Sequence, residues 1–455
     1  MRPIIAICLS GGLLAAACTT APRLDTPPVS PRGANPIGFP ASIRMETSDS
    51  DFHKENMPRA AQAVIKTADR TVDMLALSGG GAGGAYGAGV LVGLTNAGTR
   101  PRFEIVTGVS TGALIAPFAF LGPEWDGKLT EAYRGDATNN LMQSRGVGAL
   151  FDVGVFDGKP LRDLVERFVD DKLISAVAQA SRDGRMLLVA TTNLDREETV
   201  IWDMGAIAQA GGDKARKLFR DVLVASASVP GVFPPVMINV EKDGKTFQEM
   251  HVDGGASTPF FIAPETVLHM DSATANLRGA NNYVIINGQA ASVLRTTSNN
   301  TIDIAARSFN AVLNQMTRSA ILQTDDFANR NNLGYRFTGI PSDIQFGGSL
   351  AFDKANMSAT FDYGMRCASR GWSRLTPGSS GPQASRRSGW RGWGSSPRCS
   401  SRRPIAASAA RPGHCSTLSA RAGPRTVSPP ATPRPSRWWR SPSRSTSGTS
   451  PCSSG

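Results

Sequence analysis

Three short stretches of the sequence bring together residue types that could hydrolyse an ester. The first is Gly108-Val-Ser110-Thr-Gly112, a serine with a glycine two places before it and two places after it. This spacing is typical of a nucleophile elbow, because a serine on a strained turn between a strand and a helix needs neighbours without side chains. The helix that begins there would favour the negative charge that develops on an attacked carbonyl oxygen. An ordinary turn is the alternative for this pentapeptide taken alone.

The base that would activate Ser110 has two candidates in the body of the chain. His269 stands where the order serine, acid, histidine would place it, but its apolar neighbours indicate an ordinary packed histidine. Asp253 ends a strand-like segment before Gly254 and Gly255. A dry pocket raises the basicity of a carboxylate by disfavouring its charged form. A direct serine–aspartate pair can then act as nucleophile and general base.

The glycine cluster that begins at Gly79 is open to two functional interpretations. The successive bare amides of Gly79, Gly80 and Gly81 could form an oxyanion hole. The spacing of Gly79, Gly81 and Gly84 also fits a dinucleotide fingerprint, with Glu104 about 20 residues downstream, where a ribose-binding acid is expected. Glu104 falls near the start of the next strand rather than at its far end, which argues against the dinucleotide. A flexible turn without a ligand is the third interpretation.

The elements that must position these residues alternate between strand and helix. Strands are predicted over Val72–Leu77 and Phe103–Thr107, each followed by a glycine turn and a helix, over Ala85–Ala97 and Ala113–Leu121. Further strands are predicted over Met186–Thr191 and Tyr283–Asn287, and further helices over Leu161–Val169 and Ile302–Leu322. The alternation predicts an α/β sandwich with a mostly parallel sheet.

Charge separates the C-terminal end of the chain from its body. The chain has 49 Lys and Arg against 37 Asp and Glu, but residues 366–455 hold sixteen arginines and no lysine or acidic residue. Residues 1–365 therefore carry a net charge of −4, which excludes a basic, nucleic-acid-binding face on the folded part. Residues 365–455, rich in Arg, Ser and Pro, are predicted to be a disordered tail. That tail is either a natural basic segment or the product of a reading-frame shift near Met365.

The N-terminal end has the three parts of a secretory signal. Arg2, the apolar stretch Ile4–Leu14 and the small residues before Cys18 predict a signal peptide over residues 1–17. The order Leu-Ala-Ala-Ala-Cys resembles a bacterial lipoprotein signal, in which Cys18 would carry the lipid; plain secretion with Cys18 uninvolved is the alternative. Lipidation implies secretion across the inner membrane and anchoring in the bacterial cell envelope, at the outer membrane. Residues 18–60 are predicted to be a disordered tether.

Four motifs, taken together and in their order along the chain, resemble those of the patatin-like phospholipase family. The motifs are Ser78-Gly-Gly-Gly81 with Gly84, the Ser110 elbow, the block Ala225–Pro235 and Asp253-Gly254-Gly255. The resemblance covers about residues 70–364 and implies an acyl hydrolase domain over residues 61–364, with a three-layer α/β/α sandwich. The sequence departs from the family at Gly83, where many members carry Arg or Lys.

The resemblance implies a role for each residue of the site. Ser110 is the nucleophile, Asp253 is the base in a dyad without histidine, and the amides of Gly79, Gly80 and Gly81 form the oxyanion hole. The predicted function is that of a serine acyl hydrolase on carboxylic esters of lipids, like a phospholipase A or a lysophospholipase. Its partners are a lipid ester and a membrane surface, without nucleic acid, and the chemistry needs no metal or cofactor.

Two other functions stay open at this point. One is an NAD(P)-binding oxidoreductase that holds its cofactor on the Gly79–Gly84 loop. The other is a catalytically inactive binding protein of the envelope, which keeps the fold without the activity. Neither the head group, the acyl position nor the oligomeric state is indicated by any motif.

Overall fold

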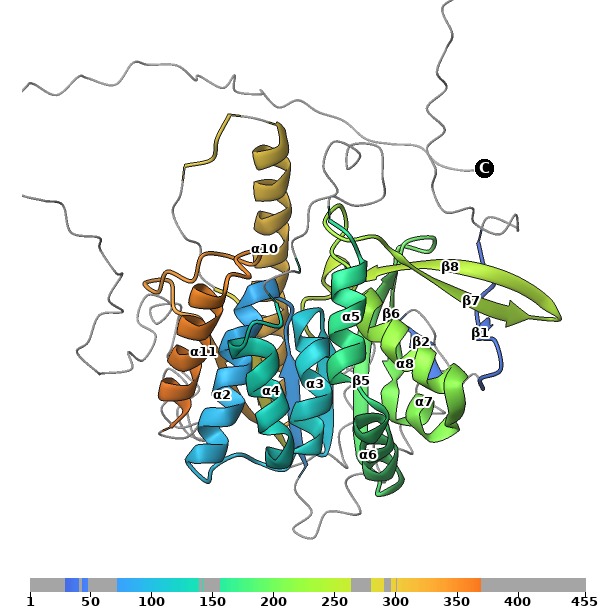
Figure 1. Cartoon of the computed structure of the whole chain (residues 1–455), viewed down its shortest axis with the longest axis horizontal. Helices are drawn as coiled ribbons and strands as arrows, with labels where there is room; N and C mark the ends of the chain where they lie inside the picture. The colour runs from blue at the N-terminus through green and yellow to red at the C-terminus, as the bar shows by residue number, and fades with distance from the viewer. Residues whose placement is uncertain are drawn as a thin grey trace, which may run out of the picture. The chain divides into compact units, whose positions relative to one another are not determined.

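One sheet of ten strands forms the centre of the structure, which is a computed structural model (Figure 1). The structure describes residues 29–40, 43–47, 72–138, 141, 156–262, 280–289, 296–299 and 301–369. Along the sheet the strands follow the order β1-β7-β8-β5-β4-β3-β9-β10, and β6 pairs with β5 and β2 off this path. The signal peptide, Cys18, His269 and the tail beyond Ser369 lie outside the described residues.

Strands and helices alternate through much of the described chain. The strands are β1 (Asn35–Pro36), β2 (Arg44–Glu46), β3 (Asp73–Leu77), β4 (Ile105–Val109), β5 (Met186–Asn193), β6 (Glu198–Asp203), β7 (Val236–Lys242), β8 (Lys245–Asp253), β9 (Asn281–Ile286) and β10 (Gly334–Gly339). The α-helices are α2 (Gly84–Asn96), α3 (Thr111–Leu121), α4 (Asp126–Arg134), α5 (Lys159–Phe168), α6 (Asp171–Arg182), α7 (Met204–Ala210), α8 (Gly212–Ser226), α10 (Thr301–Arg330) and α11 (Lys354–Ala368). This pattern confirms the predicted α/β fold.

The middle of the sheet is parallel. Strands β5, β4, β3, β9 and β10 lie side by side and run in the same direction. Every residue of β4 and β5 is buried, as expected for strands covered by helices on both faces. The prediction of a mostly parallel central sheet is confirmed in these strands, while β8, β7 and β1 extend the sheet with antiparallel pairs.

Alternate residues of β3 point into two separate apolar cores. Leu75 and Leu77 pack in the larger core, with side chains from α2, α3, α4 and α11. Met74 and Ala76 pack in the smaller core, together with Phe327 and other apolar residues of α10. Because side chains of a strand alternate between its faces, helices cover both sides of the sheet and three layers result (Figure 1).

The hairpin β7–β8 carries Asp253 to the centre of the molecule. Its turn is made by Asp243 and Gly244, which have φ angles of 51° and 73°. Asp-Gly is a preferred pair for such two-residue turns, because both positions need a positive φ. This hairpin was not predicted from the sequence, although its Asp-Gly dipeptide is typical of a hairpin turn.

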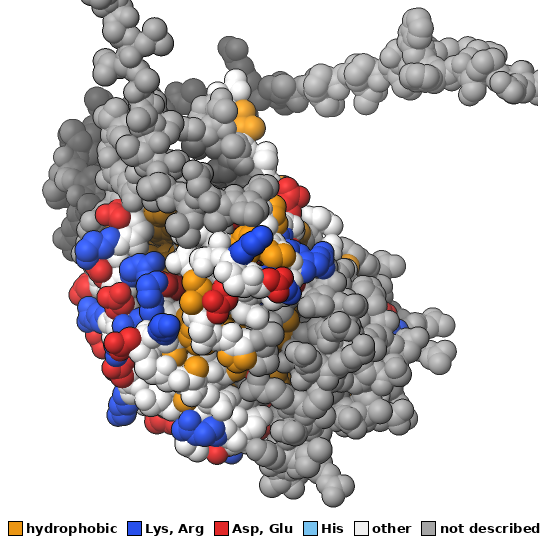
Figure 2. Space-filling view, turned by 90° about the vertical axis from the view of Figure 1, so that its right-hand side faces the viewer, with side chains coloured by type: hydrophobic (Ala, Val, Ile, Leu, Met, Phe, Trp, Pro, Cys, Tyr) orange, Lys and Arg blue, Asp and Glu red, His pale blue; other side chains and the backbone are white. Residues whose placement is uncertain are grey.

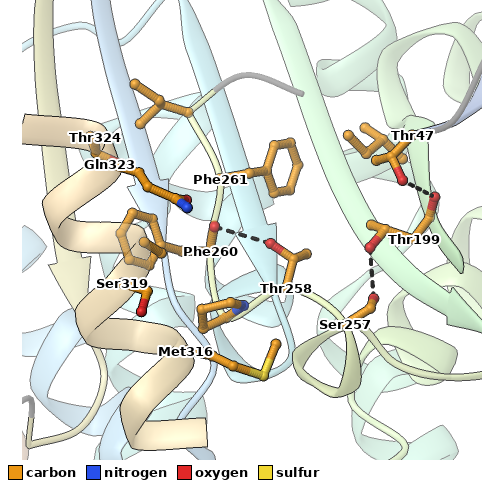
Figure 3. Close-up of a pocket in the computed structure, with 14 residues that line it drawn as sticks. Thr47, Thr199, Ser257, Thr258, Phe260, Phe261, Met316, Ser319, Gln323 and Thr324 are labelled. Carbon is orange, nitrogen blue, oxygen red and sulfur yellow. Dashed lines mark hydrogen bonds between the residues drawn. The ribbon is translucent and has the colours of Figure 1, made fainter. Parts of the chain in front are cut away.

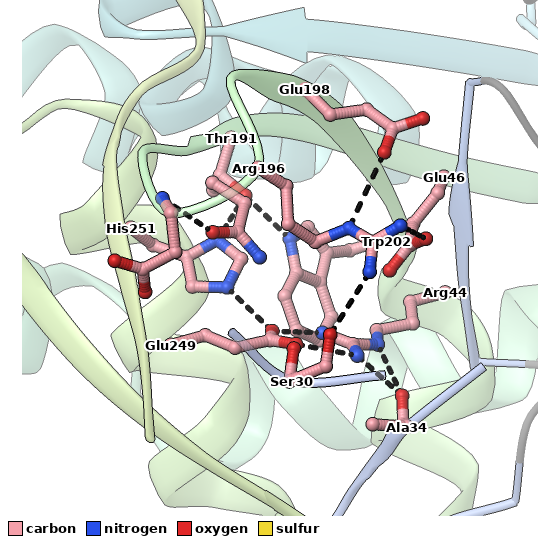
Figure 4. A network of polar contacts seen from close by, with 12 residues as sticks. Ser30, Ala34, Arg44, Glu46, Thr191, Arg196, Glu198, Trp202, Glu249 and His251 are labelled. Atoms are coloured by element: carbon pink, nitrogen blue, oxygen red, sulfur yellow. Dashed lines mark hydrogen bonds and ion pairs between the residues drawn. The ribbon is translucent and has the colours of Figure 1, made fainter. Parts of the chain in front are cut away.

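The segment before residue 48 is partly folded, in contrast to the predicted tether. Residues 35–36 pair with β7 as β1, and residues 44–46 pair with β6 as β2. The Arg44 guanidinium forms a buried two-pronged ion pair with Glu249 of β8, with N–O distances of 2.5 and 3.1 Å (Figure 4). The composition of this segment predicted a solvated tether. It could not reveal the strands, because they depend on an ion pair between residues 205 positions apart.

We expect Arg44→Met to lower the free energy of unfolding by about 3–5 kcal/mol. Burial disfavours the Glu249 carboxylate, but hydrogen bonds from His251 and Arg44 outweigh it and hold the pKa of Glu249 well below its ordinary value. Without Arg44 that buried charge loses its main partner. Urea unfolding measures the change, and adding Glu249→Gln should recover at least half of the loss. Equal midpoints for Arg44→Met and the unchanged protein would contradict this account.

The surface of the described part gives two further observations. Acidic and basic side chains are intermingled on the face seen in Figure 2, without a large area of one sign. No helix in the described ranges has both the length and the apolar character that crossing a bilayer requires.

Candidate active site

Ser110 stands on a strained turn between β4 and α3. Its φ of 56° and ψ of −127° are rare for a residue with a side chain. A Cβ on Gly108 would lie 2.6 Å from the Gly112 carbonyl oxygen, and a Cβ on Gly112 would lie 2.3 Å from the Leu77 carbonyl oxygen. Both flanking glycines are therefore required by close backbone contacts, as the elbow pattern predicts.

Strand pairing places Asp253 next to this elbow. On β5, pairing with β4 ends at Val109 opposite Ala190, and pairing with β8 begins at the next residue, with Asp253 opposite Thr191. Since β6 occupies the other edge of β5, β8 continues the edge that β4 leaves. The last residue of β8 thus comes beside the residue that follows β4, which is Ser110.

The two side chains form a direct hydrogen bond. Ser110 Oγ donates to Asp253 Oδ2 at 2.6 Å, and Asp253 Oδ1 accepts the amide of Gly255 at 2.7 Å. Both residues are buried, with exposed fractions of 5% for Ser110 and 4% for Asp253. The structure brings together the two residues that the sequence analysis paired as nucleophile and base.

Burial sets the electrostatics of Asp253. It raises the pKa of the carboxyl to about 7, although the hydrogen bonds from Ser110 and the Gly255 amide oppose the shift. A carboxylate with that pKa is a far better proton acceptor than an ordinary aspartate, and it is largely ionised just above neutral pH. The pair therefore has the basicity that a histidine usually supplies.

Two serines of the 225–235 block hold the pair in place. Ser226 Oγ accepts the Ser110 amide at 3.0 Å and donates to the Ala190 carbonyl at 2.7 Å. The Ser228 carbonyl accepts the Asp253 amide at 2.9 Å. In the sequence this block stands out only by its resemblance to the family, because no local pattern reveals contacts with residues over 20 positions away.

Removal of the Ser226 hydroxyl is expected to lower the rate of the dyad. Ser226→Ala leaves the Ser110 amide buried without its acceptor, and we expect kcat to fall by about tenfold or more with KM little changed. Ser228→Ala is the matched control, because the Ser228 hydroxyl donates to the Val224 carbonyl rather than to the dyad. Steady-state kinetics on a soluble ester would contradict the role if both variants had equal kcat.

The glycine loop lies against the nucleophile. A Cβ on Gly79 would lie 3.2 Å from Ser110 Cβ. Gly80 and Gly81 have φ angles of 153° and 56°, and a Cβ on either would come within 2.0 Å of a backbone oxygen. Side chains at these two positions would clash with the backbone at Asn287 and Ser349, so both must be glycine.

One of the three predicted oxyanion-hole amides is already occupied. The Gly79 amide donates to the Pro259 carbonyl at 3.1 Å. This contact corrects the assignment of Gly79, whose amide supports the loop instead. The amides of Gly80 and Gly81 remain as candidates from that set.

Asn287 lies beneath the glycine loop. Its side-chain amide donates to the Ser78 carbonyl at 2.7 Å, and its backbone amide donates to Ser78 Oγ at 2.8 Å. A Cβ on Gly83 would lie 2.1 Å from the Asn287 carbonyl oxygen. The departure from the family pattern at Gly83 therefore has a packing reason, since a long basic side chain would not fit against this backbone.

The other titratable candidates lie away from Ser110. Glu104 precedes β4 and accepts the Asp73 amide at 2.9 Å, which places it at the opposite end of β3 from the glycine loop. An acid there does not fit a dinucleotide held on that loop. His251 is fully buried and its ring nitrogens contact Thr191 at 2.9 Å and Glu249 at 3.1 Å (Figure 4). Its side chain is part of the ion-pair network.

Comparisons with known proteins relate this site to a protein family. The model of the patatin-like phospholipase family matches residues 75–264, which contain the glycine loop, the elbow, the serine block and Asp253. No curated protein matches the chain. Among solved structures, VipD from Legionella pneumophila is similar over 65% of this chain and 66% of its own length, with 13% identity and a TM-score of 0.32. Residues 75–264 therefore carry a patatin-like phospholipase domain, the domain of a family of lipid acyl hydrolases.

Proposed function

We propose that this protein hydrolyses carboxylic esters of lipids through a Ser110–Asp253 dyad. The observation that carries the proposal is the 2.6 Å hydrogen bond between Ser110 Oγ and Asp253 Oδ2 beneath the glycine loop. The strained elbow and the raised pKa of Asp253 support it, because each is what a buried nucleophile and its base require.

In the first half-reaction, Ser110 Oγ attacks the ester carbonyl carbon and its proton passes to Asp253. The oxyanion that forms is stabilised by the amides of Gly80 and Gly81 and by the N-terminus of α3. When the tetrahedral intermediate collapses, the bond to the alcohol oxygen breaks and Asp253 returns the proton to the leaving alcohol. An acyl-Ser110 intermediate remains.

In the second half-reaction, water takes the place of the alcohol. Asp253 accepts a proton from this water as its oxygen attacks the acyl carbon, and the new oxyanion occupies the same site. Collapse releases the carboxylic acid, and the proton on Asp253 returns to Ser110 Oγ. Bond making and breaking balance without an oxidant, a reductant or a metal ion.

The direct test compares two substrates of the full chain. We expect the full chain to hydrolyse both a short-chain nitrophenyl ester and phospholipid vesicles. Turnover of the nitrophenyl ester alone would indicate that the substrate is a soluble ester or a neutral lipid ester and not a phospholipid. A folded protein that hydrolyses neither substrate would contradict the proposal and would favour the inactive binding protein.

We also propose that the chain is exported and anchored by a lipid on Cys18. The proposal rests on Arg2, the apolar stretch Ile4–Leu14 and the Ala-Ala-Ala-Cys order. It places the enzyme at a membrane surface of the cell envelope, next to lipid esters. Mass spectrometry of the N-terminal peptide from the native source should show an acylated Cys18, and an unmodified N-terminus at another residue would refute the anchor.

A further inference from the structure

A cavity of about 250 Å³ lies between α10 and the segment that follows Asp253 (Figure 3). Residues 257–262 form one wall, α10 forms the opposite wall, and Thr47 with two residues of β6 closes the side. Neither Ser110 nor Asp253 lines this cavity. It is thus a separate space from the catalytic dyad, and the mechanism above does not use it.

The two sides of the cavity differ in chemistry. On one side Thr199 Oγ1 donates to Ser257 Oγ at 2.7 Å, and Thr47 lies beside them (Figure 3). On the other side Phe260 and Met316 present apolar surface toward the space, and α10 adds the polar side chains of Ser319, Gln323 and Thr324 (Figure 3). Among the described residues that line the cavity, none has an acidic or basic side chain.

Size and charge restrict what the cavity can hold. An engineered cavity of about 150 Å³ accommodates benzene, so this one has room for about ten non-hydrogen atoms. An ion would lose its hydration there without gaining a charged partner, which costs several kcal/mol. A neutral molecule with hydroxyl groups at one end and a short apolar tail would match both sides.

We propose that this cavity binds a small uncharged alcohol with an apolar tail, chemically a short alkyl or acyl glycerol. Its hydroxyl groups would exchange hydrogen bonds with Thr199 and Ser257, and its tail would contact Phe260 and Met316. This site lies beyond the proposed hydrolysis, and its occupant need not be the substrate.

The occupant would contact the segment that supports the catalytic residues. Ser257 Oγ lies 2.8 Å from Thr192 Oγ1, which donates to the Asp253 carbonyl at 2.9 Å. The Pro259 carbonyl in the same segment holds the Gly79 amide. A substitution in this wall would disturb the dyad as well as the cavity, so a clean test must alter the α10 wall instead.

The test measures binding of 3-butoxypropane-1,2-diol, which has two hydroxyl groups, a butyl tail and no ester bond. Calorimetric titration of the full chain should give saturable binding. Ala320 lines the cavity from α10, and Ala320→Phe should fill it and weaken binding by about tenfold or more. Ala311→Phe is the matched control, because Ala311 is exposed on the same helix outside the cavity; it should bind as the unchanged chain does.

A second probe tests the charge argument. Butyrate carries a tail of similar length with a carboxylate in place of the diol, and we expect it to bind at least about tenfold more weakly. Equal affinity for both probes would overturn the assignment to a neutral ligand. Equal diol affinity in Ala320→Phe and Ala311→Phe, or no binding by the unchanged chain, would overturn the site and leave the cavity to water.

Two further variants keep the result clear. If Ala320→Phe does not fold, Ser319→Leu fills the cavity from a half-buried position that accepts a larger side chain more readily, with the same expected loss of binding. Ser110→Ala should bind the diol as the unchanged chain does. Failure of the proposed hydrolysis would appear in ester turnover, whereas failure of this site would appear in the titration alone.

Discussion

Ser110→Ala is expected to lower kcat/KM for a lipid ester by about three orders of magnitude or more. The alanine has no oxygen to attack the carbonyl carbon, and the remaining rate would come from the polarised site alone. Steady-state hydrolysis of a nitrophenyl ester measures the change. Ser228→Ala is the control, because the buried Ser228 hydroxyl donates to the Val224 carbonyl of α8 and not to the dyad.

The fold of Ser110→Ala should remain intact, which makes the loss of rate interpretable. Alanine replaces serine at the same strained backbone position, and the Ser110 amide keeps its bond to Ser226. We therefore expect urea midpoints of the variant and the unchanged chain to agree closely. Full turnover by the folded variant would remove Ser110 as the nucleophile.

The rate is expected to depend on the ionisation of Asp253. Only the carboxylate can accept the proton of Ser110, so kcat/KM for an uncharged ester should rise as pH increases and level off above about pH 8. The midpoint should lie near 7, because burial raises the pKa of Asp253 to about 7. An ordinary aspartate, with a pKa of 3.8, would give a flat profile over this range.

Asp253→Asn should abolish this pH dependence together with most of the activity. The raised pKa of Asp253 also affects stability: the free energy of unfolding should fall with rising pH, whereas the rate should increase. Since the folded state holds the proton more tightly than the unfolded chain does, the unchanged protein loses stability as pH rises from about 4 to about 7. Asparagine cannot ionise, so the variant should resist urea at pH 8 at least as well as the unchanged chain.

Glu104→Gln is the control for the rate measurement. Glu104 is another partly buried carboxyl whose pKa is raised by burial, but it lies at the opposite end of β3. We expect its substitution to leave the midpoint of the rate profile near pH 7. Turnover by Asp253→Asn equal to that of the unchanged chain would exclude Asp253 as the base.

The sequence predicted the parts of the site that depend on local chain geometry. The elbow at Ser110 could be identified from two glycines and a preceding apolar strand, because the strained residue and both glycines lie within five residues. The glycine loop could be identified in the same way, since Gly80 and Gly81 adopt backbone angles that favour glycine. Asp253 needed the family resemblance, because an Asp-Gly-Gly sequence alone usually marks a turn.

Long-range contacts account for what the sequence did not show. The role of Ser226 depends on the elbow and on β5, both distant in the sequence. The occupied Gly79 amide depends on Pro259, and the folded strand β2 depends on the ion pair with Glu249. None of these contacts leaves a periodic pattern, so composition and spacing indicated a bare amide and a solvated tether instead.

Fluorophosphonate labelling followed by peptide mapping tests the central claim most directly. The reagent forms a covalent bond with an activated serine, so the account predicts a single tagged peptide containing Ser110. Asp253→Asn should take up the tag far more slowly, and Ser110→Ala should not take it up. A tag on another serine of an active protein, or undiminished labelling of Ser110→Ala, would contradict the account.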